Sequence, residues 1–129
     1  MKYVLIINGD PQQQEEIADA LSNRGIACRV AGSEQEAVLS LQDELPALIV
    51  WDWPAQDIPA EIFLAVLRQE GFCGSILVCT ASLEVEDIPF DLLLQKPFDL
   101  DLLSRTIGRM LIEVASLTRQ ARLCELTGA

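Results

Sequence analysis

The chain has 129 residues, half of them hydrophobic, and a formal net charge of −11. This length suits one domain with its own core, and no apolar run reaches the roughly 18 residues that a membrane-spanning helix needs. An acidic surface repels phosphate backbones, so we expect contact with neither nucleic acid nor a membrane.

The histidine and cysteine content restricts the catalytic and metal-binding functions that the chain can have. There is no histidine, which excludes a histidine general base or a histidine-based triad within this chain. The N-terminus shows no signal peptide, so we expect a cytoplasmic location and reduced thiols. The cysteines lack CxxC spacing, which argues against a zinc site; they are Cys28, Cys73, Cys79 and Cys124.

The chain begins with a strand and a helix. An unbroken apolar run over residues 3–7 predicts a strand that is covered on both faces. Asp10 follows as a helix N-cap with Pro11 at the first helical position, and Gly25 ends that helix. The helix residues expected to face the core are Ile17, Ala18, Ala20 and Leu21.

A second strand and helix come next. After a strand near residues 27–31, Ser33 and Glu36 form a capping box for a helix that Pro46 ends. The core-facing residues predicted for this helix are Ala37, Val38, Leu41 and Leu45.

Three further strands end in polar residues. A buried strand over 47–51 leads to Asp52, and a strand over 75–79 leads to Thr80. A helix is expected between them, at 61–70, with an inward face made of Ile62, Phe63, Val66 and Leu67. A fifth strand near 91–94 precedes Lys96, and a long helix begins near residue 99.

Alternation of strands and helices predicts an α/β domain with a parallel sheet and helices on both faces. In open sheets of this kind, ligands bind beyond the carboxyl ends of the strands. Residues 8–10, Asp52, Thr80 and Lys96 all lie at such ends, so we expect them to converge on one crevice.

Four segments carry a resemblance to a known family. They are Val4-Leu5-Ile6-Ile7-Asn8-Gly9-Asp10-Pro11, Pro46-Ala47-Leu48-Ile49-Val50-Trp51-Asp52, Ile76-Leu77-Val78-Cys79-Thr80-Ala81 and Gln95-Lys96-Pro97-Phe98. Over about residues 2–112 the chain resembles the CheY-like receiver domain of two-component response regulators. The resemblance implies a flavodoxin-like, doubly wound five-stranded sheet in the order 2-1-3-4-5. It also implies that Asp52 matches the residue that accepts a phosphoryl group from a histidine kinase, while Thr80 and Lys96 match its contacts.

Several positions depart from the family pattern. The two consecutive acids that hold Mg²⁺ in receivers fall on Asn8 and Gly9. Mg²⁺ is usually held by carboxylates plus phosphate, so this change should weaken metal binding. Leu93 stands where receivers carry a switching aromatic residue. The interval from Thr80 to Lys96 is also short, which predicts a fourth helix that is shortened or absent.

The residues leave two functions open. The first is a degenerate receiver, or pseudo-receiver: a non-enzymatic signalling module that binds a protein partner and has no cofactor. The alternative is a phosphorylatable receiver in which Asp10 and Asp52 hold Mg²⁺ and Asp52 accepts the phosphoryl group. Taken singly, Asp52, Thr80 and Lys96 each have an ordinary structural role, but their joint order favours the receiver site. A flavin or dinucleotide site is disfavoured, because the first loop has no glycine-rich phosphate cradle.

The last predicted helix is longer than a receiver needs. Apolar residues recur at heptad spacing, which is typical of a coiled coil. We expect residues 1–112 to form the receiver-like domain and 113–129 a projecting helix or a linker to an output domain, with homodimerisation through 99–125 as an option. The alternative is that residues 113–129 form a frayed tail whose apolar residues contact the domain. The heptad residues are Leu100, Leu103, Ile107, Met110, Val114, Leu117, Ala121 and Cys124.

Overall fold

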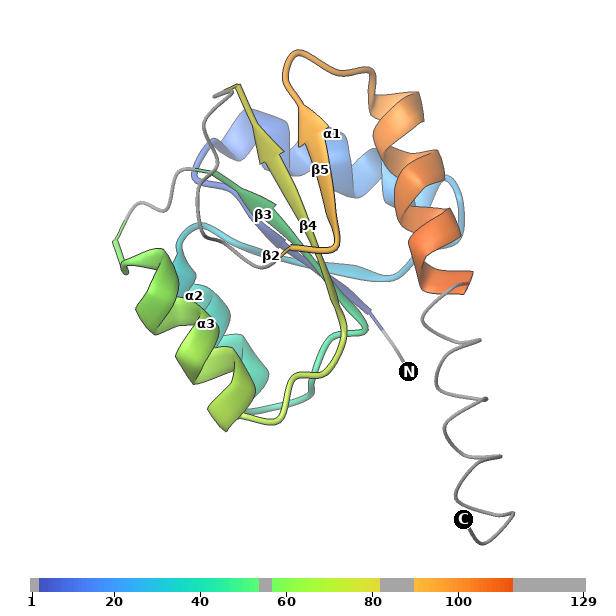
Figure 1. Ribbon diagram of the computed structural model, residues 1–129. Helices are drawn as coiled ribbons and strands as arrows, with labels where there is room; N and C mark the ends of the chain where they lie inside the picture. The colour runs from blue at the N-terminus through green and yellow to red at the C-terminus, as the bar shows by residue number, and fades with distance from the viewer. Residues whose placement is uncertain (1–2, 54–56, 82–89, 113–129) are drawn as a thin grey trace, which may run out of the picture.

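The computed structural model describes residues 3–53, 57–81 and 90–112. A parallel five-stranded sheet has the strand order β2-β1-β3-β4-β5 (Figure 1), which confirms the predicted fold class and order. The strands are β1 (Val4–Ile7), β2 (Cys28–Ala31), β3 (Leu48–Asp52), β4 (Ser75–Thr80) and β5 (Leu92–Gln95).

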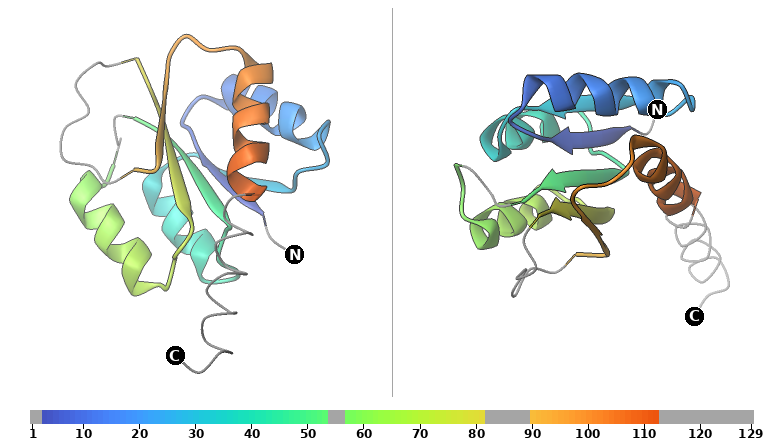
Figure 2. Two further views of the ribbon diagram at one scale, coloured as in Figure 1. Left: turned by 45° about the vertical axis from the view of Figure 1, so that its right-hand side comes forward. Right: turned by 90° about the horizontal axis from the view of Figure 1, so that it is seen from above.

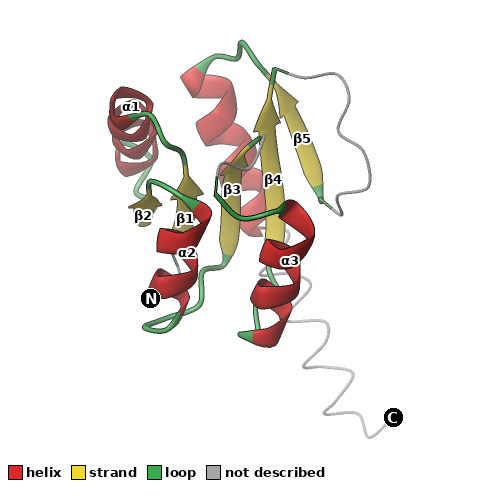
Figure 3. Ribbon diagram, turned by 90° about the vertical axis from the view of Figure 1, so that its left-hand side faces the viewer, coloured by secondary structure: helices red, strands yellow, loops and turns green. Residues whose placement is uncertain are grey.

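Helices cover both faces of the sheet (Figures 2 and 3). The helices α2 (Glu34–Leu41) and α3 (Ala60–Gln69) pack on one face. On the other face lie α1 (Pro11–Ser22) and a further helix over residues 100–112, here called the C-terminal helix. Among the described residues, no helix is both long and apolar enough to cross a bilayer.

Side chains of the central strands alternate between the two faces, as strand geometry requires. Leu5, Ile7, Ile49, Trp51 and Val78 belong to the core under α2 and α3. The residues between them pack under α1 and the C-terminal helix, and they are Val4, Ile6, Leu48, Val50 and Leu77. The unbroken apolar runs are therefore explained by burial on both faces.

The helix starts follow the predicted capping chemistry with one difference. The Asp10 side chain accepts a hydrogen bond from the backbone N–H of Gln12, at 3.0 Å, and Gly25 has a φ of +74° after α1 ends. Ser33 Oγ accepts from the N–H of Glu36 at 3.2 Å. The Glu36 carboxylate, however, accepts from the N–H of Gly32, at 2.7 Å, and so closes the capping box one residue early.

The described elements correct several local predictions. Asp52 and Thr80 belong to their strands, because ladder pairing continues through Asp52–Cys79 and Thr80–Gln95. Ile62 is 55% exposed and Leu45 39% exposed, so neither lies in the core. On α3 the spacing of four residues places Phe63 and Leu67 inward, and Ile62 falls outside that stripe. Leu45 lies beyond the end of α2. Ala18 and Ala20 are only partly buried.

The C-terminal helix packs on the domain itself. Leu103, Ile107 and Met110 are buried against the sheet, so this part of the heptad pattern forms core. Arg24, just past α1, fixes the helix by donating to Ser104 Oγ at 2.7 Å and to Asp101 Oδ1 at 2.8 Å. The predictions for 113–129 and for a shortened fourth helix within 82–89 lie outside the described residues.

Candidate functional site

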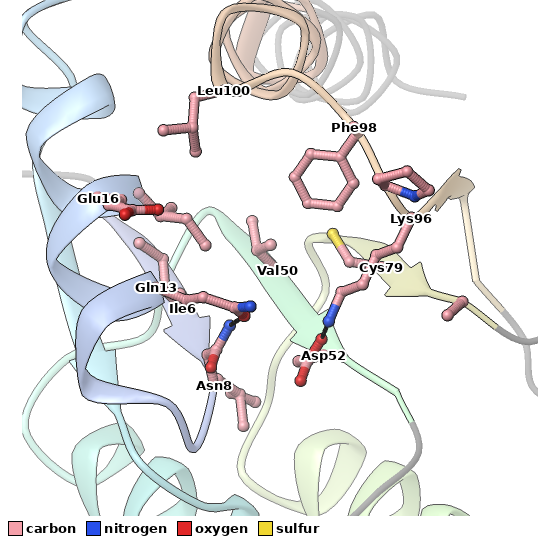
Figure 4. A pocket seen from close by; sticks show the side chains of 14 residues that line it. Ile6, Asn8, Gln13, Glu16, Val50, Asp52, Cys79, Lys96, Phe98 and Leu100 are labelled. Carbon is pink, nitrogen blue, oxygen red and sulfur yellow. Dashed lines mark hydrogen bonds and ion pairs between the residues drawn. The ribbon is translucent and has the colours of Figure 1, made fainter.

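An ion pair occupies the carboxyl edge of the sheet. Asp52 is the last residue of β3, and its Oδ1 atom accepts a hydrogen bond from Lys96 Nζ, just past β5 (Figure 4). The two side chains are 23% and 26% exposed. The structure therefore brings together two of the residues that the sequence placed at strand ends.

Thr80 lies on the strand between this pair. It is the last residue of β4 and is fully buried. Its backbone oxygen accepts from the N–H of Lys96 at 2.7 Å, which fixes the backbone from which the lysine side chain extends. The Lys96–Pro97 peptide bond is cis.

The polar groups of Asn8, in the loop after β1, form hydrogen bonds within the loop and with α1. Asn8 is 4% exposed, and its Oδ1 accepts from the N–H of Asp10 at 2.8 Å. Its Nδ2 donates to Gln13 Oε1 at 3.0 Å, and its backbone oxygen accepts from the Gln14 side chain. Asn8 thus supports the turn into α1, and its side-chain amide contributes no anionic oxygen.

Gly9 is exposed and leaves room for a side chain. A Cβ atom at this position would meet nothing nearer than the backbone oxygen of Gly32, at 3.5 Å, which is an ordinary contact. Asp10 uses its carboxylate to cap α1, where it accepts from the N–H of Gln12. Within residues 3–53, 57–81 and 90–112, no three acidic or cysteine side chains form a cluster suited to a metal ion.

A pocket of about 440 Å³ opens beside the ion pair, between α1 and the segment that joins β5 to the C-terminal helix (Figure 4). Asn8, Asp52 and Lys96 lie on its wall, and its floor is mostly apolar. Cys79 also lines it. Burial, with a further contribution from Asp52 that Lys96 opposes, raises the pKa of the Cys79 thiol to about 12. The thiol is therefore neutral and a poor nucleophile at pH 7.

Sequence reasoning missed a buried carboxyl group on the opposite face. Glu34, which is 1% exposed, accepts from Trp51 Nε1 at 3.0 Å. The Asp57 carboxylate lies at the start of α2 and accepts from the N–H groups of Glu34 and Gln35, at 3.2 and 3.4 Å. A side-chain hydrogen bond from Glu34, followed by these backbone bonds, holds the pKa of Asp57 below its usual value. The available signal was Trp51, since a buried indole N–H needs an acceptor.

A parallel sheet in this order, with an acid at the end of the third strand and a lysine after the fifth, is the CheY-like receiver fold. The receiver domain of Francisella response regulator 1452 has a TM-score of 0.75 to this chain, with 22% identity over 88% of this chain and 98% of that one. A CheY-like receiver domain protein from Methanospirillum hungatei has a TM-score of 0.78, with 18% identity and coverage of 90% and 98%.

A third structure belongs to a longer protein. The N-terminal domain of a three-domain response regulator/sensory box/GGDEF protein from Carboxydothermus hydrogenoformans has a TM-score of 0.77, with 18% identity over 91% of this chain and 99% of that domain. The sequence matches no protein-family model and no curated protein. The structural likenesses therefore establish the fold.

Proposed function

We propose that this chain is a pseudo-receiver: a non-enzymatic, cytoplasmic signalling module that binds a protein partner or output domain without Mg²⁺-dependent phosphorylation of Asp52. The observation that carries this proposal is the loop after β1. Asn8 and Gly9 occupy the positions of the receiver acid pair, and both side-chain polar atoms of Asn8 are engaged within the loop and α1. The positions of the acid pair therefore carry neither of the carboxylates that Mg²⁺ prefers, and Asp10, the acid that follows them, caps α1.

The Asp52–Lys96 ion pair is compatible with this proposal. Phosphoryl transfer depends on cations that neutralise the charge of the transferring group. Here the ammonium of Lys96 bonds directly to the Asp52 carboxylate and supplies charge compensation within the protein. The pair satisfies a largely buried carboxylate without any ligand.

The alternative is a phosphorylatable receiver, with Asp52 as phospho-acceptor from a histidine kinase and Mg²⁺ as the required ion. The retention of Asp52, Thr80 and Lys96 at three neighbouring strand ends favours it. This reading needs Asp10 as a metal ligand. Asp10 would have to release the first turn of α1, which its carboxylate caps.

Tryptophan fluorescence separates the two functions, because Trp51 and Trp53 flank Asp52. The protein is titrated with Mg²⁺, with and without beryllofluoride as a phosphoryl mimic. We expect no saturable change in the parent protein. A change that Asp52→Asn abolishes would establish the alternative.

A restored acid pair tests the observation itself. The variant Asn8→Asp with Gly9→Asp returns both carboxylates, and position 9 has space for the side chain. We expect this variant to gain a saturable Mg²⁺ response that a further Asp52→Asn change removes. Gly9→Asn is the matched control, since it adds a side chain of the same size without charge. If the double variant folds but gives no saturable response to Mg²⁺, the loop after β1 is not what prevents metal binding.

The partner side of the proposal rests on the fold. The Carboxydothermus neighbour is the first of three domains in its protein, which supports an output domain joined to the end of this one. Homodimerisation through residues 99–125 is a second route, and it requires the part beyond residue 112, because Leu103, Ile107 and Met110 are committed to the core. Analytical ultracentrifugation of the full chain, compared with a chain ending at residue 112, tests the dimer.

A further inference from the structure

The pocket beside the ion pair has the size and lining of a small-molecule site. Its volume of about 440 Å³ lies within the roughly 300–1,000 Å³ range of ligand pockets. Ile6 and Val50 form its floor, while Phe98 and Leu100 close it on the side of the C-terminal helix (Figure 4). Among the described residues, these groups present a largely apolar surface to the pocket.

The charges around the pocket select the kind of ligand. The ionisable lining residues are Glu16, Asp52 and Lys96, together with the neutral thiol of Cys79. Lys96 is paired with Asp52, so Glu16 leaves the lining with a net negative charge. Within the part of the chain that the structure describes, Glu16 Oε1 accepts one long hydrogen bond, at 3.4 Å, from the Gln12 side chain. An anionic ligand would be repelled here, and the charge of −11 on the whole chain adds to that effect.

We propose that this pocket binds a small organic amine with an apolar body. The body lies on Ile6 and Val50 against the Phe98 ring, and the ammonium group bonds to the Glu16 carboxylate at the edge of α1. Such a ligand joins an apolar surface to one charge-assisted hydrogen bond, which is a common design for specific pockets.

The position of the pocket places this ligand between two elements of the domain. It is flanked by α1 on one side and by the connection that begins the C-terminal helix on the other. A bound molecule contacts both elements and also touches Lys96, one partner of the ion pair. The pocket shares Asn8, Asp52 and Lys96 with the candidate receiver site, but amine binding needs neither Mg²⁺ nor a phosphoryl group and so does not rest on the proposed function.

Matched probes test the proposal. Phenylbutylamine, phenylbutanol and phenylbutyrate share one apolar body and differ in the terminal group. Each is titrated into the full chain without Mg²⁺, and backbone amide shifts in the nuclear magnetic resonance spectrum locate the binding. We expect the amine to give saturable shifts at Ile6, Glu16, Val50 and Leu100, the alcohol to bind more weakly and the acid not to bind.

Two surface variants identify the charge contact. Glu16→Gln keeps the side-chain shape and should weaken amine binding about tenfold, the effect expected on losing a hydrogen bond to a charged group. Glu15→Gln removes the same charge from a neighbouring residue that does not line the pocket, and binding should be unchanged. Circular dichroism checks that both variants fold.

Three results would overturn the proposal. The first is the absence of saturable pocket shifts for the amine up to its solubility limit. The second is equal binding of the amine and the acid, which would remove charge as the selecting feature. The third is an equal effect of Glu16→Gln and Glu15→Gln, which would reduce the binding to general attraction by an acidic surface.

Discussion

The ion pair at the end of the sheet makes a quantitative prediction about stability. The change Lys96→Met keeps an unbranched side chain of similar length and removes the ammonium group. The Asp52 carboxylate, with 23% of its side chain exposed, then loses its charged partner.

The magnitude follows from the burial of the pair. Breaking a fully buried pair costs about 3–5 kcal/mol, whereas an exposed pair contributes roughly 0–1 kcal/mol. With about a quarter of each side chain exposed, this pair lies between the two limits, so we expect a loss of about 2 kcal/mol. Replacing both members, as Asp52→Leu with Lys96→Met, removes the uncompensated charge and should recover most of that loss.

Urea unfolding followed by tryptophan fluorescence measures these differences. Arg105→Met is the matched control, because Arg105 pairs with Asp101 at 3.0 Å but the two side chains are 59% and 58% exposed. That control should cost no more than about 0.5 kcal/mol. The reasoning is refuted if Lys96→Met costs as little as the control, or if the double replacement is no more stable than the single one.

Further predictions concern other sites. A Cβ on Gly74 would collide with neighbouring backbone, so Gly74→Ala should lower the free energy of unfolding by about 1–3 kcal/mol. Gly108→Ala, which meets nothing within 4 Å, should be neutral or stabilising by up to about 1 kcal/mol; urea unfolding measures both changes. Burial raises the pKa of Cys79 to about 12 from 9.0, so its contribution to stability is complete below about pH 9 and is lost as the pH rises towards 12. Urea unfolding across that range should show a steeper alkaline decline than in Cys79→Ala, and a parallel decline would contradict the assignment. The hydrogen bond from the Glu34 side chain lowers the pKa of Asp57, so the Asp57 contribution is present above about pH 4 and is lost as the pH falls through the folded-state pKa. The free energy of unfolding of Asp57→Asn should therefore depend less on acid pH than that of the parent. Identical pH profiles would show that the Asp57 carboxylate does not stabilise the start of α2.

The sequence was sufficient for features that repeat along the chain. The sheet could be predicted because its central strands are buried on both faces and read as unbroken apolar runs. The meeting of Asp52 and Lys96 could also be predicted, since parallel strands place their carboxyl ends at one edge. Neither inference required knowledge of which side chains touch.

Other features depend on contacts between distant segments. Ile62 is exposed because of how α3 is rotated about its axis against the sheet. Helical periodicity in the sequence does not decide between this rotation and one that turns the helix by a single residue. The contact of Glu34 with Trp51 and Asp57 joins three separate segments. The pocket likewise arises from the distance between α1 and the C-terminal helix. Periodicity in one segment contains no information about such spacing.

The space beside Gly9 also bears on how few base changes would place acids at positions 8 and 9. Codons for asparagine and aspartate differ by a single base, as do half of the glycine codons from those of aspartate. Because a Cβ at Gly9 meets only an ordinary contact, an acid at this position requires no change in the atoms around its Cβ. One base change gives aspartate at position 8, and one base change gives it at position 9 from two of the four glycine codons. A library of point mutants, screened for a saturable response to Mg²⁺, would therefore contain both acids.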